Sequence, residues 1–143
     1  MLCERITPRI SPLALLVDSD ADSRQMYAEW LRFSGFRVAE AATSQEALAR
    51  VHVIRPHIIT TAIGLPGEDG WSLIVRLKAD VHTHHIPIIL VTAYVEPTLL
   101  PRARRVGCDA VLTKPCLPSR LLAEIERLLT HGRPPSAGAP RAA

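Results

Sequence analysis

Five short, mainly apolar segments recur along the chain, and none of them alternates strictly between apolar and polar residues. Continuous apolar runs of this kind are typical of strands that are buried on both faces, as in a parallel β-sheet. Their lengths of four to six residues and the turn-forming residues around them favour strands over helices. The predicted strands cover residues 13–17, 36–39, 57–61, 86–91 and 110–113.

Segments with a helical repeat of apolar positions separate these runs. Asp20 or Asp22 can cap the first helix, Gly35 can end it, and Thr43–Glu46 has the pattern of a capping box. Pro101 would interrupt a helix that began well before it, which weakens the fourth helical pattern. The predicted helices cover residues 21–34, 43–54, 71–78, 96–106 and 118–130.

The first of these helices carries a wide apolar stripe. Its members are Met26, Tyr27, Trp30, Leu31 and Phe33. Such a stripe normally faces the hydrophobic core. We therefore expect most aromatic residues of the chain to occupy core positions on this helix.

Strands and helices thus alternate five times, with short connections between them. This order predicts an α/β fold in which a five-stranded parallel sheet lies between two layers of helices, with right-handed crossovers. We expect one such domain over residues 13–130, preceded by an N-terminal extension of residues 1–12. Residues 131–143 are rich in Pro, Ala and Gly, so we expect them to form a disordered tail.

Composition excludes several classes of protein. Hydrophobic residues make up 48% of the 143 residues, which excludes a disordered chain, and no apolar run is long enough to span a membrane. The first residues lack the apolar core of a signal peptide, and the cysteines, Cys3, Cys108 and Cys116, have no metal-binding spacing. We therefore expect a cytoplasmic protein with reduced thiols. The net charge of +3 weakly favours an acidic partner or nucleic acid.

Polar residues follow the predicted strands at the edge of the sheet where their carboxyl ends meet. Asp18, Ser19 and Asp20 follow the first strand, Thr92 follows the fourth, and Lys114 follows the fifth. Carboxylates are the ligands that Mg²⁺ prefers, while a lysine and a hydroxyl can bind phosphate oxygens. Functional sites of open parallel sheets lie at this edge. The pattern therefore indicates a site of the magnesium and phosphoryl type.

Four motifs in this order resemble the receiver domain of two-component response regulators, the CheY-like family. They are Leu16–Asp20 with Arg24, Leu65–Gly70, Ile86–Ala93 and Gly107–Pro115, and the resemblance spans residues 13–129. It implies the (βα)5 fold of flavodoxin and CheY, and a site at which Mg²⁺ supports phosphorylation of an aspartate. It also implies a cis peptide bond between Lys114 and Pro115.

The sequence departs from that family where phosphorylation needs carboxylates. The phosphoacceptor aspartate corresponds to Ala62, which offers no nucleophile, and the second acid of the usual pair corresponds to Ser19. Asp18 and the carbonyl group of Gly64 remain from the metal site. One carboxylate and one carbonyl should hold Mg²⁺ poorly, so we expect weak or absent Mg²⁺ binding and no other cofactor.

The remainder of the phosphoryl pocket is only partly retained. Thr92 and Lys114 match the hydroxyl and the lysine that hold the phosphoryl group in the family. With fewer anions nearby, Lys114 should instead take Asp18 as a structural counter-ion. The aromatic residue of the family's conformational switch corresponds to Val111, so both the input and the lever of that switch are missing.

We therefore interpret the chain as a stand-alone pseudo-receiver. In this interpretation it is a non-enzymatic signalling module of a two-component or phosphorelay system that binds a protein partner without phosphorylation at the usual site. The resemblance places the partner surface, or a homodimer contact, on the fourth helix, the fifth strand and the fifth helix. Arginines there could contact acidic side chains of a sensor kinase, a regulator or an output protein. They are Arg102, Arg105, Arg120 and Arg127.

Two other functions are open to this sequence. A working phosphorelay receiver could use another acid as its phosphoacceptor, namely Asp18, Asp20 or Asp69. A nucleic-acid-associated protein could use the arginine face, although the chain has no recognition-helix motif and no interleaved aromatic residues on that face.

Two small clusters have simpler interpretations than the chemistry they suggest. His82, His84 and His85 could bind zinc, but no cysteine or acid lies at ligand spacing, so we interpret the segment as a solvated loop. Cys108 and Cys116 flank the fifth strand and could sense redox state, but we interpret them as small buried apolar residues.

Overall fold

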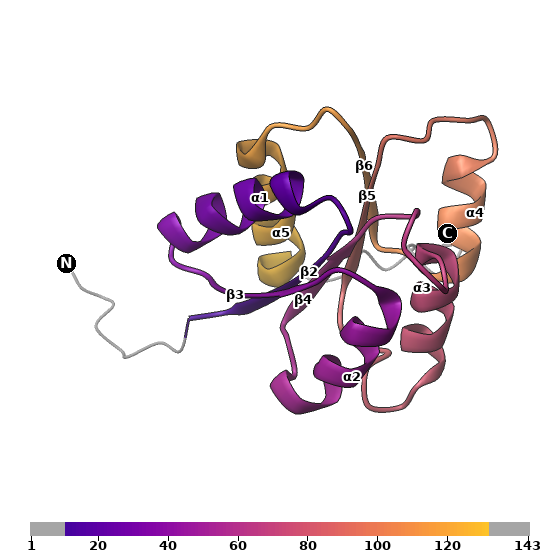
Figure 1. The fold of residues 1–143 in the computed structure, drawn as a ribbon, viewed down its shortest axis with the longest axis horizontal. Coiled ribbons are helices and arrows are strands. Elements are labelled where there is room, and N and C mark those ends of the chain that lie inside the picture. The colour runs from indigo at the N-terminus through magenta and orange to yellow at the C-terminus, as the bar shows by residue number, and fades with distance from the viewer. Residues whose placement is uncertain (1–10, 132–143) are drawn as a thin grey trace.

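A computed structural model describes residues 11–131 of the chain, and in it a five-stranded parallel sheet lies between two layers of helices (Figure 1). The strand order is β3-β2-β4-β5-β6, and each strand is followed by a helix. The strands are β2 (Leu13–Val17), β3 (Arg37–Ala41), β4 (Ile58–Thr61), β5 (Ile88–Thr92) and β6 (Ala110–Thr113). The helices are α1 (Ala21–Phe33), α2 (Ser44–Ile54), α3 (Gly70–Ala79), α4 (Leu99–Val106) and α5 (Pro118–His131). The predicted α/β fold is confirmed.

Two hydrophobic cores lie on the two faces of the sheet. Helices α2, α3 and α4 cover one core, and helices α1 and α5 cover the other (Figure 1). Consecutive strand residues point alternately into the two cores, so Leu15 belongs to the first and Leu16 to the second. Because both faces are buried, the strands have continuous apolar sequences, which is the pattern that identified them.

Some element boundaries differ from the predicted ones for local reasons. Strand β3 continues to Ala41, past residue 39, because all five of its residues pair with β2. Helix α4 begins at Leu99, so Pro101 falls in its first turn, where a proline is tolerated. Helix α5 includes His131, which the sequence assigned to the tail. Residues 1–10 of the predicted extension and 132–143 of the predicted disordered tail lie outside the described residues.

The start of α2 has the capping that its sequence predicted. The hydroxyl of Thr43 accepts a hydrogen bond from the backbone N–H of Glu46 at 3.0 Å. The carboxylate of Glu46 in turn accepts one from the backbone N–H of Ala42 at 2.8 Å. Two N–H groups at this helix end therefore have partners within the chain.

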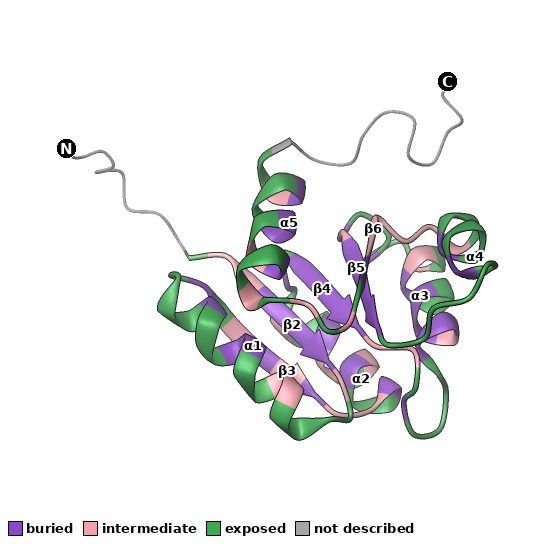
Figure 2. Cartoon of the chain, turned by 90° about the horizontal axis from the view of Figure 1, so that it is seen from above, coloured by how far each residue is buried: buried purple, intermediate pink, exposed green. Residues whose placement is uncertain are grey.

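Helix α1 does not bury the whole apolar stripe that the sequence assigned to the core. Tyr27 and Leu31 are buried, but Met26, Trp30 and Phe33 are 44%, 41% and 88% exposed. The three exposed residues follow an i, i+4, i+7 repeat and therefore lie on one side of the helix, away from the sheet. Figure 2 shows this outward side of α1 as largely exposed. The expectation that most aromatic residues lie in core positions of this helix was wrong.

No helix within residues 11–131 combines the length and the apolar character needed to cross a membrane.

Candidate functional site

The carboxyl ends of four parallel strands bring the predicted site residues to one edge of the sheet. The register pairs Val17 with Thr61 between β2 and β4, and Thr92 with Thr113 between β5 and β6. Asp18, Ala62 and Lys114 come directly after three of these strands. Parallel pairing therefore fixes their common position at this edge.

Asp18 and Lys114 form an ion pair at this edge. The Nζ atom of Lys114 lies 2.8 Å from Oδ2 of Asp18, and the two side chains are 21% and 15% exposed. The other carboxylate oxygen, Oδ1, accepts a hydrogen bond from the backbone N–H of Asp20 at 2.9 Å. Both oxygens of Asp18 thus have partners within the chain, and the predicted counter-ion pair is present. The peptide bond between Lys114 and Pro115 is cis, as the resemblance implied.

A second internal contact lies beside the ion pair. The hydroxyl of Ser19 donates a hydrogen bond to the carbonyl oxygen of Gly64 at 3.3 Å. Ala62 presents only a methyl group, and its carbonyl oxygen accepts a hydrogen bond from the hydroxyl of Thr61 at 2.9 Å. The resemblance assigns the carbonyl of Gly64 to a metal. In this structure that carbonyl accepts a hydrogen bond from the hydroxyl of Ser19.

Thr92 and Val111 occupy different surroundings. Thr92 is 2% exposed, and its hydroxyl oxygen accepts a hydrogen bond from the backbone N–H of Tyr94 at 2.9 Å. Val111 is half-buried and lines a groove of about 690 Å³ between α4 and the connection from β6 to α5. Val111 is the position that the resemblance assigns to the aromatic residue of the family's switch.

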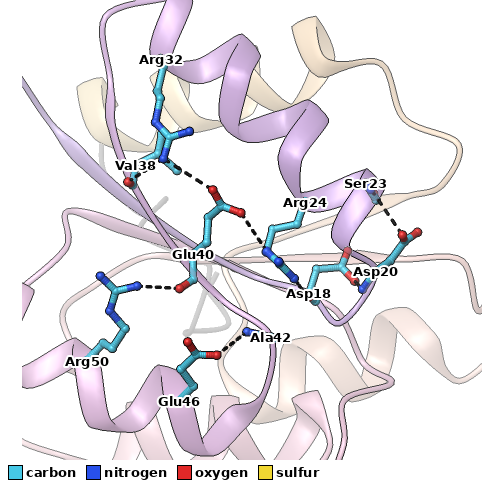
Figure 3. A network of polar contacts seen from close by, with 10 residues as sticks. All are labelled: Asp18, Asp20, Ser23, Arg24, Arg32, Val38, Glu40, Ala42, Glu46 and Arg50. Carbon is cyan, nitrogen blue, oxygen red and sulfur yellow. Dashed lines mark hydrogen bonds and ion pairs between the residues drawn. The ribbon is translucent and has the colours of Figure 1, made fainter.

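A polar network links Asp18 to residues of α1, β3 and α2 (Figure 3). Nε of Arg24 on α1 lies 2.9 Å from Oε1 of Glu40 on β3, while Nη1 of Arg24 donates to the backbone carbonyl of Asp18. Arg32 lies 3.5 Å from the same glutamate, and Arg50 on α2 donates to its backbone carbonyl at 2.7 Å. The network joins α1, β3 and α2. Glu40 was missed by sequence reasoning because nothing marks an acid within a strand as the partner of an arginine on a preceding helix.

The other acids at this edge cap helices. Asp20 accepts a hydrogen bond from the backbone N–H of Ser23 at the start of α1. Asp69 accepts one from the backbone N–H of Ser72 at the start of α3, at 2.9 Å. Acidic side chains are favourable at these positions because helix N-termini carry partial positive charge.

Most of the predicted surface arginines have partners within the chain. Arg102 on α4 lies over the ring of Trp71, 4.5 Å from its centroid. Arg120 and Arg127 on α5 both pair with Glu124. Burial acts to raise the pKa of Glu124, but hydrogen bonds from Arg127 and Arg120 outweigh it and hold that pKa below its usual value. Arg105 is exposed on α4.

The histidine loop and the cysteines also have definite places. His82, His84 and His85 are exposed, and among residues 11–131 no group of three or more His, Cys, Asp or Glu side chains is arranged to hold a metal ion. Cys108 and Cys116 are free and half-buried.

The shift in thiol pKa differs between the two cysteines and predicts different reactivity. Burial raises the pKa of the Cys108 thiol to about 11, and burial also raises the pKa of Cys116. Because the thiolate is the nucleophile, we expect iodoacetamide at pH 8 to modify Cys116 at least about tenfold faster than Cys108. Peptide mass spectrometry over a time course measures the two rates. Equal rates, or a faster Cys108, would contradict the burial of that thiol.

Comparisons with known proteins agree with this geometry. The response regulator receiver domain family matches residues 14–126. The chain is 36% identical over 126 residues to the phosphate regulon transcriptional regulatory protein PhoB of Pseudomonas aeruginosa, over 88% of this chain and 55% of that protein. It is 33% identical over 119 residues to the transcriptional regulatory protein PrrA of Mycobacterium tuberculosis, over 83% of this chain and 50% of PrrA. The chain spans about half the length of the curated relatives it matches.

Solved structures show the same fold. The chemotaxis response regulator CheY4 of Vibrio cholerae matches with a TM-score of 0.78 and 27% identity, over 83% of this chain and 99% of that one. A CheY-like receiver domain protein from Methanospirillum hungatei matches with a TM-score of 0.81 and 27% identity, over 86% of this chain and 97% of that one. With a family match over most of its length and the CheY-like arrangement of five strands and five helices, the chain belongs to the response regulator receiver domain family.

Proposed function

We propose that this receiver domain is a pseudo-receiver, a signalling module that binds a protein partner without being phosphorylated at the usual site. One observation carries the proposal: at the edge where Ala62 supplies no carboxylate, the remaining polar groups pair with each other. Asp18 pairs with Lys114, and Ser19 pairs with the carbonyl of Gly64. Without a nucleophile the site cannot be phosphorylated, and its remaining polar groups already have partners within the chain. We therefore propose that the domain keeps a single conformation.

The donor set at this edge does not suit Mg²⁺. That ion requires near-octahedral coordination by oxygen, with one or two carboxylates among its ligands. Of the positions that the resemblance assigns to the metal, Asp18 alone supplies a carboxylate, and the ammonium group of Lys114 lies 2.8 Å from it. The carbonyl oxygen of Gly64 accepts a hydrogen bond from the hydroxyl of Ser19. We therefore propose that Mg²⁺ binding is weak or absent.

Phosphorylation of another acid has less support from the contacts. Asp20 and Asp69 cap helices α1 and α3 through backbone N–H groups, and Asp18 is held by Lys114. A phosphorylated acid would lose its present partners. A role in binding nucleic acid has little support, since the guanidinium groups of Arg120 and Arg127 are engaged by Glu124.

We propose that the partner docks on the groove between α4, β6 and the start of α5. Apolar residues line its centre, including Leu99, Leu100 and Val111. The charged residues that line the groove are Glu96 and Arg120, and helix α4 beside it carries exposed arginines at 104 and 105 and no acidic residue. Protein interfaces combine an apolar centre with a polar rim, so the groove fits a protein that presents an apolar contact ringed by acidic side chains.

Treatment with acetyl phosphate and Mg²⁺ tests the central proposal. We expect no acid-labile, hydroxylamine-sensitive phosphoprotein from this chain, because Ala62 has no carboxylate to attack phosphorus. Intact-mass measurement gives the extent of labelling, and a receiver with an acceptor aspartate serves as the positive control. Labelling of this chain would overturn the proposal, and peptide mapping would then identify the acid used.

Charge reversal on α4 tests the docking surface. Arg105→Glu is expected to weaken binding to a partner identified by cross-linking at least about tenfold, because it repels acidic side chains at the rim. Arg76→Glu is the matched control, since it makes the same charge change on α3 and leaves α4, which borders the groove, unchanged. Equal affinities for the two variants would contradict the proposed surface. Sedimentation of the chain alone would reveal a homodimer at this groove.

A further inference from the structure

A second cavity lies at the opposite edge of the sheet from the Asp18–Lys114 pair. It has a volume of about 590 Å³ and is bounded by the end of α2, the start of β4, the loop between α3 and β5, and the end of α5. Its titratable and charged lining is His52, Arg55, His57, His82 and His85. We call it the histidine cavity. The sequence alone showed only the histidines of the 82–85 loop, and the fold adds two more histidines and an arginine.

Two of these histidines are fixed as hydrogen-bond donors. Nδ1 of His57 accepts the backbone N–H of Leu13 at 3.0 Å, so the ring proton of the neutral form is on Nε2. Nε2 of His52 lies 2.9 Å from Oδ2 of Asp80. The backbone N–H of His82 and the ring of His52 hold the pKa of Asp80 below its usual value, so this carboxylate is ionised and accepts from His52.

The charged and titratable groups around the cavity come from three segments of the chain. From α2 come His52 and Arg55, from the start of β4 comes His57, and from the loop after α3 come His82 and His85. Asp80 is the carboxylate in contact with them, and it is engaged by His52 and the backbone of His82. The end of α5 contributes the apolar Leu129.

Arg55 has a backbone conformation that glycine adopts more easily than other residues. It ends α2 in the left-handed region, with φ of 49° and ψ of 67°. Among the described residues it is the one non-glycine residue with positive φ. That conformation is disfavoured for a residue with a Cβ atom. Within residues 11–131 its guanidinium group forms no salt bridge, so it is available to a ligand.

We propose that the histidine cavity binds a phosphate monoester, with the guanidinium group of Arg55 and the Nε2–H group of His57 donating to the phosphate oxygens. Arginine binds phosphate through two parallel donors, and imidazole N–H groups add further hydrogen bonds. The apolar lining around Leu129 would contact the organic part of the ligand. This site is independent of the proposed partner groove.

Titration with phenyl phosphate and with inorganic phosphate tests the site. Calorimetry at pH 7 should detect binding of phenyl phosphate, because the guanidinium group of Arg55 and the ring N–H of His57 both line the cavity as donors. Phenyl phosphate should also bind more tightly than inorganic phosphate, which lacks the apolar part. Equal affinities of the two probes would overturn the monoester assignment and leave free phosphate as the ligand.

Two variants separate binding from folding. Arg55→Gly removes the guanidinium group and relieves the left-handed conformation, so it should weaken binding at least about tenfold without lowering the melting temperature. His57→Asn keeps an acceptor for the N–H of Leu13 and removes the Nε2–H donor, so it should also weaken binding. His84→Gln is the control, because His84 lies in the loop that supplies His82 and His85 but does not line the cavity, and this variant should bind like the unchanged protein.

Three results would overturn the proposal. One is unchanged affinity in Arg55→Gly and His57→Asn, which would place the ligand elsewhere. Another is the absence of any phosphate binding at millimolar concentration. The third is tight Zn²⁺ binding that is lost on replacing His52 or His82 while phosphate does not bind, which would make the cavity a metal site.

Discussion

The double substitution Ser19→Asp with Ala62→Asp is expected to create Mg²⁺ binding, and with it phosphorylation by acetyl phosphate, in a domain that we expect to lack both. The two new carboxylates would join Asp18 at the ends of β2 and β4. Three carboxylates and the carbonyl of Gly64 form an oxygen-rich donor set suited to Mg²⁺. Ala62→Asp also supplies a nucleophile. Thr92 and Lys114 lie at the same edge of the sheet and could bind the phosphoryl oxygens. We expect Mg²⁺ affinity to rise at least about tenfold.

Single and displaced substitutions are the controls for this gain. Ala62→Asp alone should gain little Mg²⁺ affinity. Ser19 still offers no carboxylate, and its hydroxyl still donates a hydrogen bond to the carbonyl of Gly64. Ser119→Asp with Ala123→Asp makes the same two residue changes at exposed positions of α5 and should have no effect on Mg²⁺ binding. Tryptophan fluorescence and intact mass follow binding and labelling. If the double variant shows no Mg²⁺-dependent change, the assignment of the pocket is wrong.

Lys78→Met is expected to lower the free energy of unfolding by about 3–5 kcal/mol. The Nζ atom of Lys78, on α3, lies 3.1 Å from Oδ2 of Asp109, whose side chain is 1% exposed. The same ammonium group donates to the carbonyl of Ile86 at 2.9 Å. Methionine retains the apolar stem but removes the ammonium group that pairs with the buried carboxylate of Asp109, which also accepts the backbone N–H of Ile88. Removing one partner of a buried ion pair is costly. The pair therefore ties α3 to the residues that precede β5 and β6.

A surface arginine of the same helix provides the comparison. Arg76→Met removes an exposed pair with Glu68, in which the side chains are 58% and 43% exposed. Exposed ion pairs contribute about 0–1 kcal/mol, so this variant should unfold close to the unchanged protein. Urea unfolding followed by circular dichroism measures both. If Lys78→Met were no more destabilising than Arg76→Met, the buried pair would not support the fold as we infer.

Much of the fold was predictable because its signals are local. Continuous apolar runs identified the strands, and caps such as Thr43 located helix starts within the chain segment that forms them. Strand order along the sequence then placed Asp18, Ala62 and Lys114 at one edge. The ion pair of Asp18 with Lys114 was predicted because Ser19 and Ala62 carry no carboxylate that could pair with the lysine, and the structure contains it.

Periodicity could not give the side of α1 that faces the sheet. The apolar repeat includes Tyr27 and Leu31, which are buried, and Trp30 and Phe33, which are exposed. A wide stripe contains two possible faces, and the choice between them depends on where the sheet and α5 lie. The same holds for Glu40, whose partner Arg24 is set by the packing of α1 against β3.

Residue types and their order along the chain thus determined the α/β class and the edge of the sheet at which Asp18, Ala62 and Lys114 lie. Those properties depend on local composition and on the geometry that all parallel strands share. Tertiary packing decided the contacts between segments distant in sequence: the hydroxyl of Ser19 on the carbonyl of Gly64, and the meeting of His52, His57 and His85 around one cavity. Such contacts depend on the relative positions of loops and helices in space, which no local pattern of residues specifies.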